Sequence, residues 1–321
     1  MSSGFIGVLA VGWLLAAGGP ATRPATRVAT KPTTGPAGAL PAPEAERVRG
    51  LVQALGDADP DARQEALDAL REVGRDAAPY LIEGLADASA AVRAGCARAL
   101  GLVGGASALQ PLSGRLLGDE AGEVRAASAD ALGALGQVAG LAALSRALGD
   151  ADANVRSAAG LSVGQAVRIA RGRGALSAEE QAQVRAAVGP LIDALRDPQA
   201  PVRGNAAISL GALRDGQALA ALALASLDQD PLVRASVCHG LEELGDRAAG
   251  GALVELLDDA DVTVRRSAIE ALERIAGFTL SYQPRGPEPE RRAAIARWRA
   301  WWERTKRQLQ EEERQKQAPR P

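Results

Sequence analysis

The side chains that most often carry out chemistry are scarce in this sequence. The 321 residues include one histidine, His239, and two cysteines, Cys96 and Cys238. A metal site that needs two histidines is therefore excluded, and the sequence contains no P-loop, CxxC pair or plausible Rossmann glycine set. We expect His239 to be solvated and the two thiols to be unpaired packing residues, and we predict no catalytic residue, metal or cofactor.

Two short segments imitate functional motifs. Residues Gly160–Gly164 match G-x-S-x-G, but a nucleophile elbow needs a strand before Ser162 and a sharp turn at it. The segment DADPD at 57–61 resembles the start of a calcium loop, although Ala62 replaces the required glycine and Asp68 stands at position 12. We interpret Ser162 as a helix residue and the aspartates as helix caps.

Both segments lie inside a repeat that covers most of the chain. In each of seven blocks, an aspartate stands six residues before an arginine, and the arginines follow one another at intervals of 30, 32, 31, 47, 31 and 31 residues. The pairs are Asp57/Arg63, Asp87/Arg93, Asp119/Arg125, Asp150/Arg156, Asp197/Arg203, Asp228/Arg234 and Asp259/Arg265. A period of this length indicates a repeat architecture.

Each block is typical of a helix, a tight turn and a second helix. Small or apolar residues stand at offsets −1, +3, +4 and +7 from each arginine, which is one helical face. Glycines such as Gly101 and Gly133 are expected to end the second helices in the left-handed conformation. Since one helix pair cannot bury both faces, the pattern predicts an all-α solenoid of about seven pairs over residues 44–276.

The D-x5-R core resembles HEAT repeats, specifically the short bacterial HEAT-like class also found in phycobilin lyases. The resemblance covers about 230 residues. It implies that the seven Asp–Arg pairs are structural and form a ladder of hydrogen bonds between neighbouring repeats. Arginine suits this role because its planar fork donates several hydrogen bonds to a carboxylate or carbonyl.

The N-terminal residues are typical of an exported protein. The apolar run Phe5–Ala17 is too short to span a bilayer as a helix, but it has the length of a signal-peptide core. We predict a signal peptide or membrane anchor at 1–19, which could tether the protein, and a disordered Pro/Thr/Ala-rich linker at 20–43. The n-region lacks Lys and Arg, so cytoplasmic residence is the alternative.

The interval between Arg156 and Arg203 is about 16 residues too long, with the excess at 168–183. Ser177 and Glu180 fit a capping box that opens a helix, and the preceding ARGRG is expected to be a loop. This loop could reach over one face and touch a partner, or it could be a tolerated surface insertion.

The repeat stops at Gly277. Residues 277–313 are predicted to form a loop and a helix from about Glu290 to Glu313, followed by a disordered tail at 314–321. The helix places Trp298, Trp301 and Trp302 on one face, which would cap the last repeat. An aromatic ligand platform is the alternative.

Charge is unevenly distributed along the chain. Residues 1–43 carry +3 and residues 285–321 carry +5, which leaves about −10 on the repeats. A nucleic-acid-binding array is expected to carry a basic groove, so nucleic acid is an unfavourable partner.

The second helices of HEAT-like arrays line the concave face, and offsets +2 and +5 are the expected exposed rows. From the +5 row we predict that Arg98, Asp130, Leu161, Ile208 and His239 contact a partner. These features favour a monomeric, non-enzymatic scaffold that binds a protein or peptide. A lyase or lyase partner resembling phycobilin lyases is the alternative, and a nucleic-acid-acting HEAT protein is disfavoured by charge.

Overall fold

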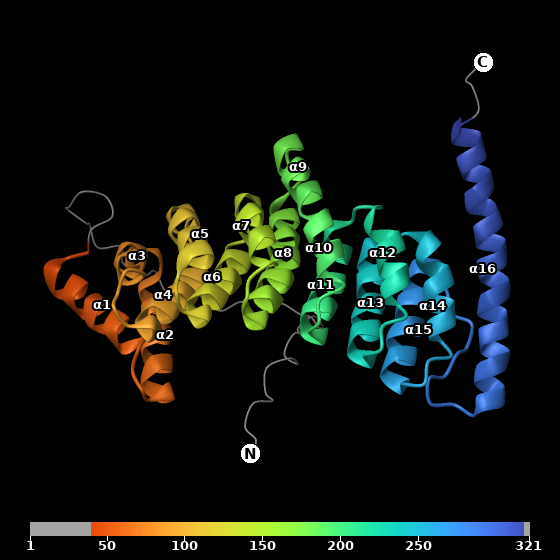
Figure 1. The fold of residues 1–321 in the computed structure, drawn as a ribbon, viewed down its shortest axis with the longest axis horizontal. Helices are drawn as coiled ribbons and strands as arrows, with labels where there is room; N and C mark the ends of the chain where they lie inside the picture. Colours follow the sequence, from red (N-terminus) through yellow and green to blue (C-terminus); the bar gives the residue numbers. More distant parts are fainter. Residues whose placement is uncertain (1–39, 318–321) are drawn as a thin grey trace, which may run out of the picture. The chain divides into compact units, whose positions relative to one another are not determined.

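Residues 40–317 are described by the computed structural model, and all their regular elements are helices that stack side by side in chain order (Figure 1). The predicted all-α solenoid is therefore confirmed. The predicted leader at 1–19 and most of the predicted linker at 20–43 lie outside the described residues. Within the described part, no helix is both long and apolar enough to cross a membrane.

Seven helix pairs form the stack. The first helices of the pairs are α1 (Ala42–Ala54), α3 (Ala78–Gly84), α5 (Leu109–Gly118), α7 (Leu141–Ala147), α10 (Val188–Ala194), α12 (Ala218–Ala225) and α14 (Gly250–Leu256). The second helices are α2 (Pro60–Val73), α4 (Ala90–Val103), α6 (Gly122–Leu135), α8 (Ala153–Arg173), α11 (Ala200–Leu213), α13 (Pro231–Leu244) and α15 (Val262–Ala276). Two further helices, α9 (Ala178–Ala186) and α16 (Glu288–Gln317), belong to the insertion and the C-terminal cap.

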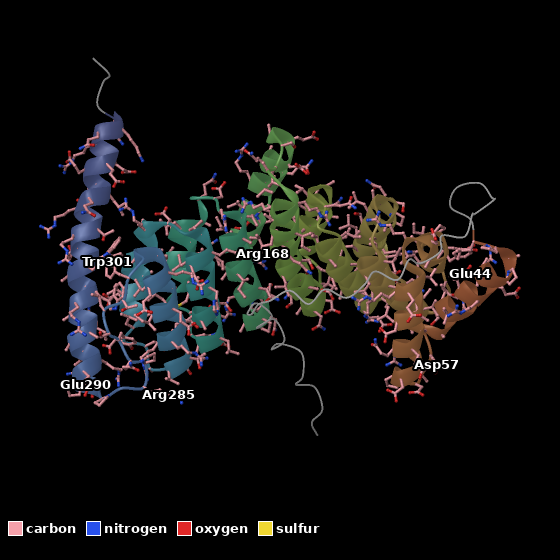
Figure 2. All side chains as sticks on the ribbon, turned by 180° about the vertical axis from the view of Figure 1, so that it is seen from behind. Glu44, Asp57, Arg168, Arg285, Glu290 and Trp301 are labelled. Atoms are coloured by element: carbon pink, nitrogen blue, oxygen red, sulfur yellow. The ribbon has the colours of Figure 1, made fainter. Side chains whose placement is uncertain are left out.

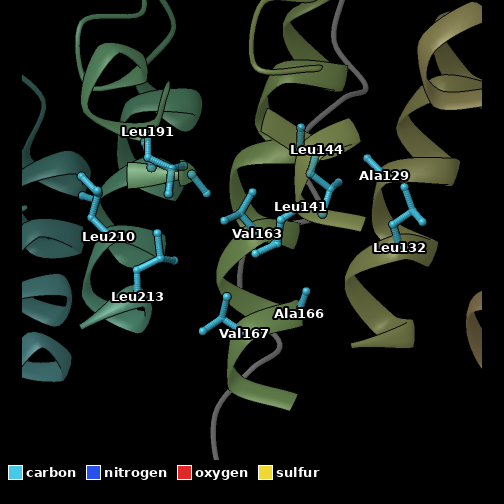
Figure 3. Close-up of a cluster of buried hydrophobic side chains, with 14 of the residues drawn as sticks. Ala129, Leu132, Leu141, Leu144, Val163, Ala166, Val167, Leu191, Leu210 and Leu213 are labelled. Carbon is cyan, nitrogen blue, oxygen red and sulfur yellow. The ribbon is translucent and has the colours of Figure 1, made fainter. Parts of the chain in front are cut away.

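The predicted core face is confirmed. Every residue at offset +7 is fully buried, namely Leu70, Leu100, Leu132, Val163, Leu210, Leu241 and Leu272. Figure 3 shows leucines and valines of α6, α7, α8, α10 and α11 meeting in the spaces between these helices. The core is thus continuous from repeat to repeat and consists mainly of Ala, Val and Leu.

Glycines inside the second helices allow neighbouring backbones to approach closely. A Cβ on Gly101 would lie 2.9 Å from Cα of Ala131, and one on Gly211 would lie 2.7 Å from Cα of Gly240. The expectation that Gly101 and Gly133 end their helices was wrong, because both lie within helices and pack against the next second helix. The left-handed residue that ends α6 is Gly136 instead.

The insertion lengthens α8 before it forms α9. The expected ARGRG loop was wrong, since α8 continues to Arg173. The predicted capping box is confirmed, because the Glu180 amide donates to Ser177 Oγ and the Ser177 amide donates to Glu180 Oε2. In Figure 1, α9 stands beyond the ends of its neighbours at one edge of the stack.

The C-terminal helix α16 covers the last repeat. Trp298 is fully buried, its ring stacks on Phe278 at 5.7 Å and meets Trp301 edge-on at 5.4 Å. Cβ atoms on Gly250 and Gly251 would lie about 3 Å from the indoles of Trp301 and Trp302, so these glycines let α16 pack directly on α14. The predicted helix is present but runs over Glu288–Gln317, so residues 314–317 of the predicted disordered tail are helical instead. The indole faces are occupied by packing.

Replacing Gly211 with alanine should destabilise the stack by about 1–3 kcal/mol, because the new methyl meets the backbone of Gly240 rather than a movable side chain. Gly114→Ala is the matched control: its Cβ meets nothing within 4 Å, and alanine's helix propensity should stabilise α5 slightly. Urea unfolding followed by circular dichroism measures both. Equal effects of the two substitutions would contradict the close-packing interpretation.

Candidate functional site

Within each repeat, the Asp–Arg pair holds the turn before the second helix. Oδ1 of the aspartate accepts the amide two residues later, as Asp150 does from Asp152 at 2.8 Å. The arginine then donates from Nη1 to the carbonyl oxygens of that aspartate and of the next residue, as Arg156 does to Asp150 and Ala151. All seven repeats make both sets of bonds, so D-x5-R determines the local turn geometry.

The same arginine also joins its repeat to the next one. Nε and Nη2 of Arg156 donate to the two carboxylate oxygens of Asp197 at 2.6 and 3.1 Å. Five arginines form such bidentate rungs, Arg93–Asp119, Arg125–Asp150, Arg156–Asp197, Arg203–Asp228 and Arg234–Asp259. The Arg156 rung forms across the insertion, which shows that the longer interval leaves the inter-repeat geometry intact.

The two end positions of the ladder differ from the middle. Arg63 bonds to the carbonyls of its own turn, while Asp87 Oδ2 accepts from Gln53 at 3.0 Å. At the other end, Arg265 Nε donates to the Pro284 carbonyl at 2.9 Å, so the loop before α16 takes the place of a next repeat. Five of the seven arginines therefore bond to the aspartate of the next repeat, and only Arg63 and Arg265, at the two ends, do not.

The ladder carboxylates are stabilised as charged groups. Hydrogen bonds from Arg125 are the largest influence on Asp150 and hold the pKa of its carboxyl below the usual value, although partial burial acts in the opposite direction. The side chains of this pair are 16% and 12% exposed. Such partly buried, bidentate pairs are worth more than surface ion pairs, because solvent screens them less.

The +5 row of the second helices faces solvent. Arg98, Asp130, Leu161 and His239 are exposed and Ile208 is half-buried. Neighbouring protein atoms raise the pKa of the Asp130 carboxyl, and the Arg98 charge opposes this shift. The five residues therefore form one exposed line across α4, α6, α8, α11 and α13, while their role in binding stays a prediction.

The expectation that the +2 row is also exposed was wrong for most of its members. Ala127 and Ser267 are buried, and a Cβ on Gly95 would lie 2.6 Å from Leu55. Asn205 Nδ2 donates to the carbonyl and hydroxyl of Ser157 in the preceding second helix. The small residues of this row thus serve packing between repeats.

The sequence reasoning missed the residues one helical turn beyond the +5 row. Leu102, four residues after Arg98, is 51% exposed, and Glu243 lies four residues after His239. Adding four to each +5 position would have found them, because residues i and i+4 share a helical face.

An ion pair across three second helices shows which side of the stack is concave. Arg168 on α8 donates to Glu243 on α13 at 2.9 Å, and α11 lies between the two. The second helices also pack on one another more extensively than the first helices do. The stack therefore curves toward the second helices, and Arg168 lies near the middle of their row (Figure 2).

The comparison with protein families agrees with this geometry. The model of HEAT repeats matches residues 48–133 and 222–283, and the model of the PBS lyase HEAT-like repeat matches residues 124–150. The chain is a HEAT-repeat protein. A search of the curated proteins gave no match.

Several solved structures are similar to this chain at low sequence identity. Human deoxyhypusine hydroxylase in complex with glycerol is 23% identical, with 72% of this chain and 96% of that chain covered and a TM-score of 0.35. The complex of CpcE and CpcF of phycocyanin lyase from Nostoc sp. PCC7120 is 20% identical (76% and 91% covered, TM-score 0.43). A designed armadillo repeat protein in complex with the peptide (KR)4 is 18% identical (71% and 99% covered, TM-score 0.41).

The residues that imitate catalytic motifs serve the HEAT repeats. Ser162 is buried in the middle of α8 against Gly133, and no strand precedes it. Burial, with a smaller contribution from Asp87, raises the pKa of the Cys96 thiol to about 12, so this thiol is inert at neutral pH. No cluster of three or more His, Cys, Asp or Glu side chains within residues 40–317 has the geometry to hold a metal ion.

Removing a central rung should destabilise the HEAT solenoid. Arg156→Ala breaks bonds to both its own turn and Asp197, leaving a partly buried carboxylate unpaired, so we expect a loss of about 2–3 kcal/mol. Arg98→Ala, on an exposed arginine of α4, should change stability by less than about 0.5 kcal/mol. Urea denaturation of both variants tests the difference. A similar loss of unfolding free energy in each would show that the bonds to Asp197 do not stabilise the stack.

Proposed function

We propose that this HEAT solenoid is a non-enzymatic scaffold that binds a protein or peptide on its concave face. The observation that carries the proposal is the +5 line across five adjacent second helices. Nearly every other apolar side chain of those helices is buried. Side chains that stay wholly or partly exposed at one offset of adjacent helices are free to contact a partner.

The chemistry of this line indicates the kind of partner. Leu161 and Ile208 are apolar and lie at its centre, with Asp130 and Arg98 on one side and His239 on the other. An apolar centre with a polar rim is the usual arrangement of a protein-binding surface. An amphipathic segment with two or three apolar anchors and charged flanks would match it, as in the recognition of helices or extended peptides by grooves.

The second candidate is a lyase or lyase partner of the phycobilin-lyase type, which the match at residues 124–150 motivates. A tetrapyrrole would need a large pocket, and the aromatic side chains of the described residues gather instead at α16, apart from Tyr80. Incubation with a bilin separates the candidates: a shift in visible absorption with covalent transfer to an acceptor would overturn the scaffold proposal.

Substituting the centre of the line should abolish partner binding. The experiment places a photo-crosslinking amino acid at His239, identifies the captured protein by mass spectrometry, and measures its affinity for variants. We expect Leu161→Asp to weaken binding at least tenfold, about 1.4 kcal/mol, because an apolar anchor is lost. Leu117→Asp is the matched control, since Leu117 is 41% exposed on first helix α5 and Leu161 is 38% exposed. If both variants lose the same affinity, or if neither loses any, the concave-face assignment is contradicted.

We also propose that the protein is exported, which the apolar run Phe5–Ala17 and the small residues after it support. In a cell that processes the leader, the mature protein should lack about 19 N-terminal residues and fractionate with the envelope or medium. Intact mass and fractionation measure this, and recovery of the full-length chain in the cytoplasm would overturn the proposal.

A further inference from the structure

A basic pocket lies at the insertion. A hollow of about 460 Å³ lies between the end of α8, the middle and end of α9, and the end of α11. Arg171, Arg185 and Arg214 line it, together with Gln181 and the apolar Leu176 and Val184. Three arginines at one hollow stand out in a repeat region whose net charge is about −10.

Three arginines and one carboxylate, that of Asp215, line the pocket, so positive charge is in excess there. Arg171 donates to the carbonyl oxygens of Ala212 and Leu213, which are neutral groups at the end of α11. Among the described residues, neither Arg185 nor Arg214 forms an ion pair, and the Asp215 carboxylate at the rim accepts the Gln217 amide. Burial is the main cause that lowers the pKa of Arg171; the neighbouring Arg214 charge adds to it, and the Glu243 carboxylate acts in the opposite direction.

Arg214 occupies a backbone position where an arginine is strained. It ends α11 in the left-handed conformation with φ of 50°. The same offset, eleven residues after the ladder arginine, is glycine in four other repeats, Gly74, Gly104, Gly136 and Gly245, each with positive φ. A non-glycine residue costs about 1 kcal/mol or more there. In the repeat beside the insertion, this position therefore holds a strained arginine that lines the pocket in place of glycine.

We propose that the pocket formed by Arg171, Arg185 and Arg214 is an oxyanion-binding site that takes a carboxylate or phosphate group. Each guanidinium presents several N–H donors in a planar fork, which matches the two or three oxygens of such a group. Leu176 and Val184 provide an apolar wall for the organic part of the ligand. This site lies at the insertion and does not depend on the concave-face proposal.

Two arginines near the end of α8 hold the insertion to the helices on either side. Arg173 donates to the carbonyls of Leu135 and Gly136 at the end of α6, while Arg171 does so at the end of α11. The lengthened α8 is therefore held at both neighbours, as basic side chains hold helix C-termini. A pocket whose walls are held in this way needs little rearrangement when an anion binds.

The test is a series of thermal melts of the full chain at constant ionic strength, with 10 mM inorganic phosphate, succinate or chloride. Because ligand binding stabilises the folded state, phosphate or succinate should raise Tm by about 2 °C relative to chloride. A rise with phosphate alone assigns the site to phosphorylated ligands, and a rise with succinate, alone or as well, assigns it to carboxylates.

Arg214→Gly is the decisive variant, because it should fold at least as well as the parent. Relief of the backbone strain should raise Tm in chloride, while the response to phosphate and succinate should disappear. Arg185→Gln should lose the Tm response to phosphate and succinate without a higher Tm in chloride. Arg98→Gln, on the concave face, should keep the Tm response. An absent response in the parent protein, or an unchanged response in Arg214→Gly, would overturn the proposal.

Discussion

The stack depends on one arginine per repeat that bonds in two directions at once. Nη1 of Arg156 holds the turn of its own repeat through two carbonyls, while Nε and Nη2 bind both oxygens of Asp197 in the next. Because the aspartate that accepts the fork also caps its own turn, a change in one rung alters the turn on each side. This coupling explains why the pair recurs at an invariant offset although each side chain alone is an ordinary polar residue.

Close packing of the second helices gives the stack its curvature. Glycines such as Gly101, Gly164 and Gly211 bring adjacent second helices into backbone contact, whereas the first helices touch one another less extensively. The solenoid therefore bends toward the second helices, and the pair of Arg168 with Glu243 spans the bend. A core made of Ala, Val and Leu is a consequence, since large aromatic rings would hold the helices apart.

Departures from the regular repeat lie where the fold needs an end or gains a new feature. The aromatic residues gather at α16 because a terminal repeat exposes an apolar face that must be covered. The insertion adds α9 and the arginine pocket while Arg156 still reaches Asp197. A solenoid accepts such additions because each repeat contacts only its neighbours.

The sequence by itself determined the all-α class, the repeat boundaries, the buried offsets, the capping box and the exposed +5 row. All of these follow from helical periodicity and from bonds between residues a few positions apart. The tertiary structure decided the roles of Gly101 and Gly133, which depend on a helix about 31 residues away. It also turned ARGRG from an expected loop into helix, because carbonyls at the ends of α6 and α11 accept from Arg173 and Arg171. Contacts that join distant segments have no signature in local composition, so only the folded stack reveals them.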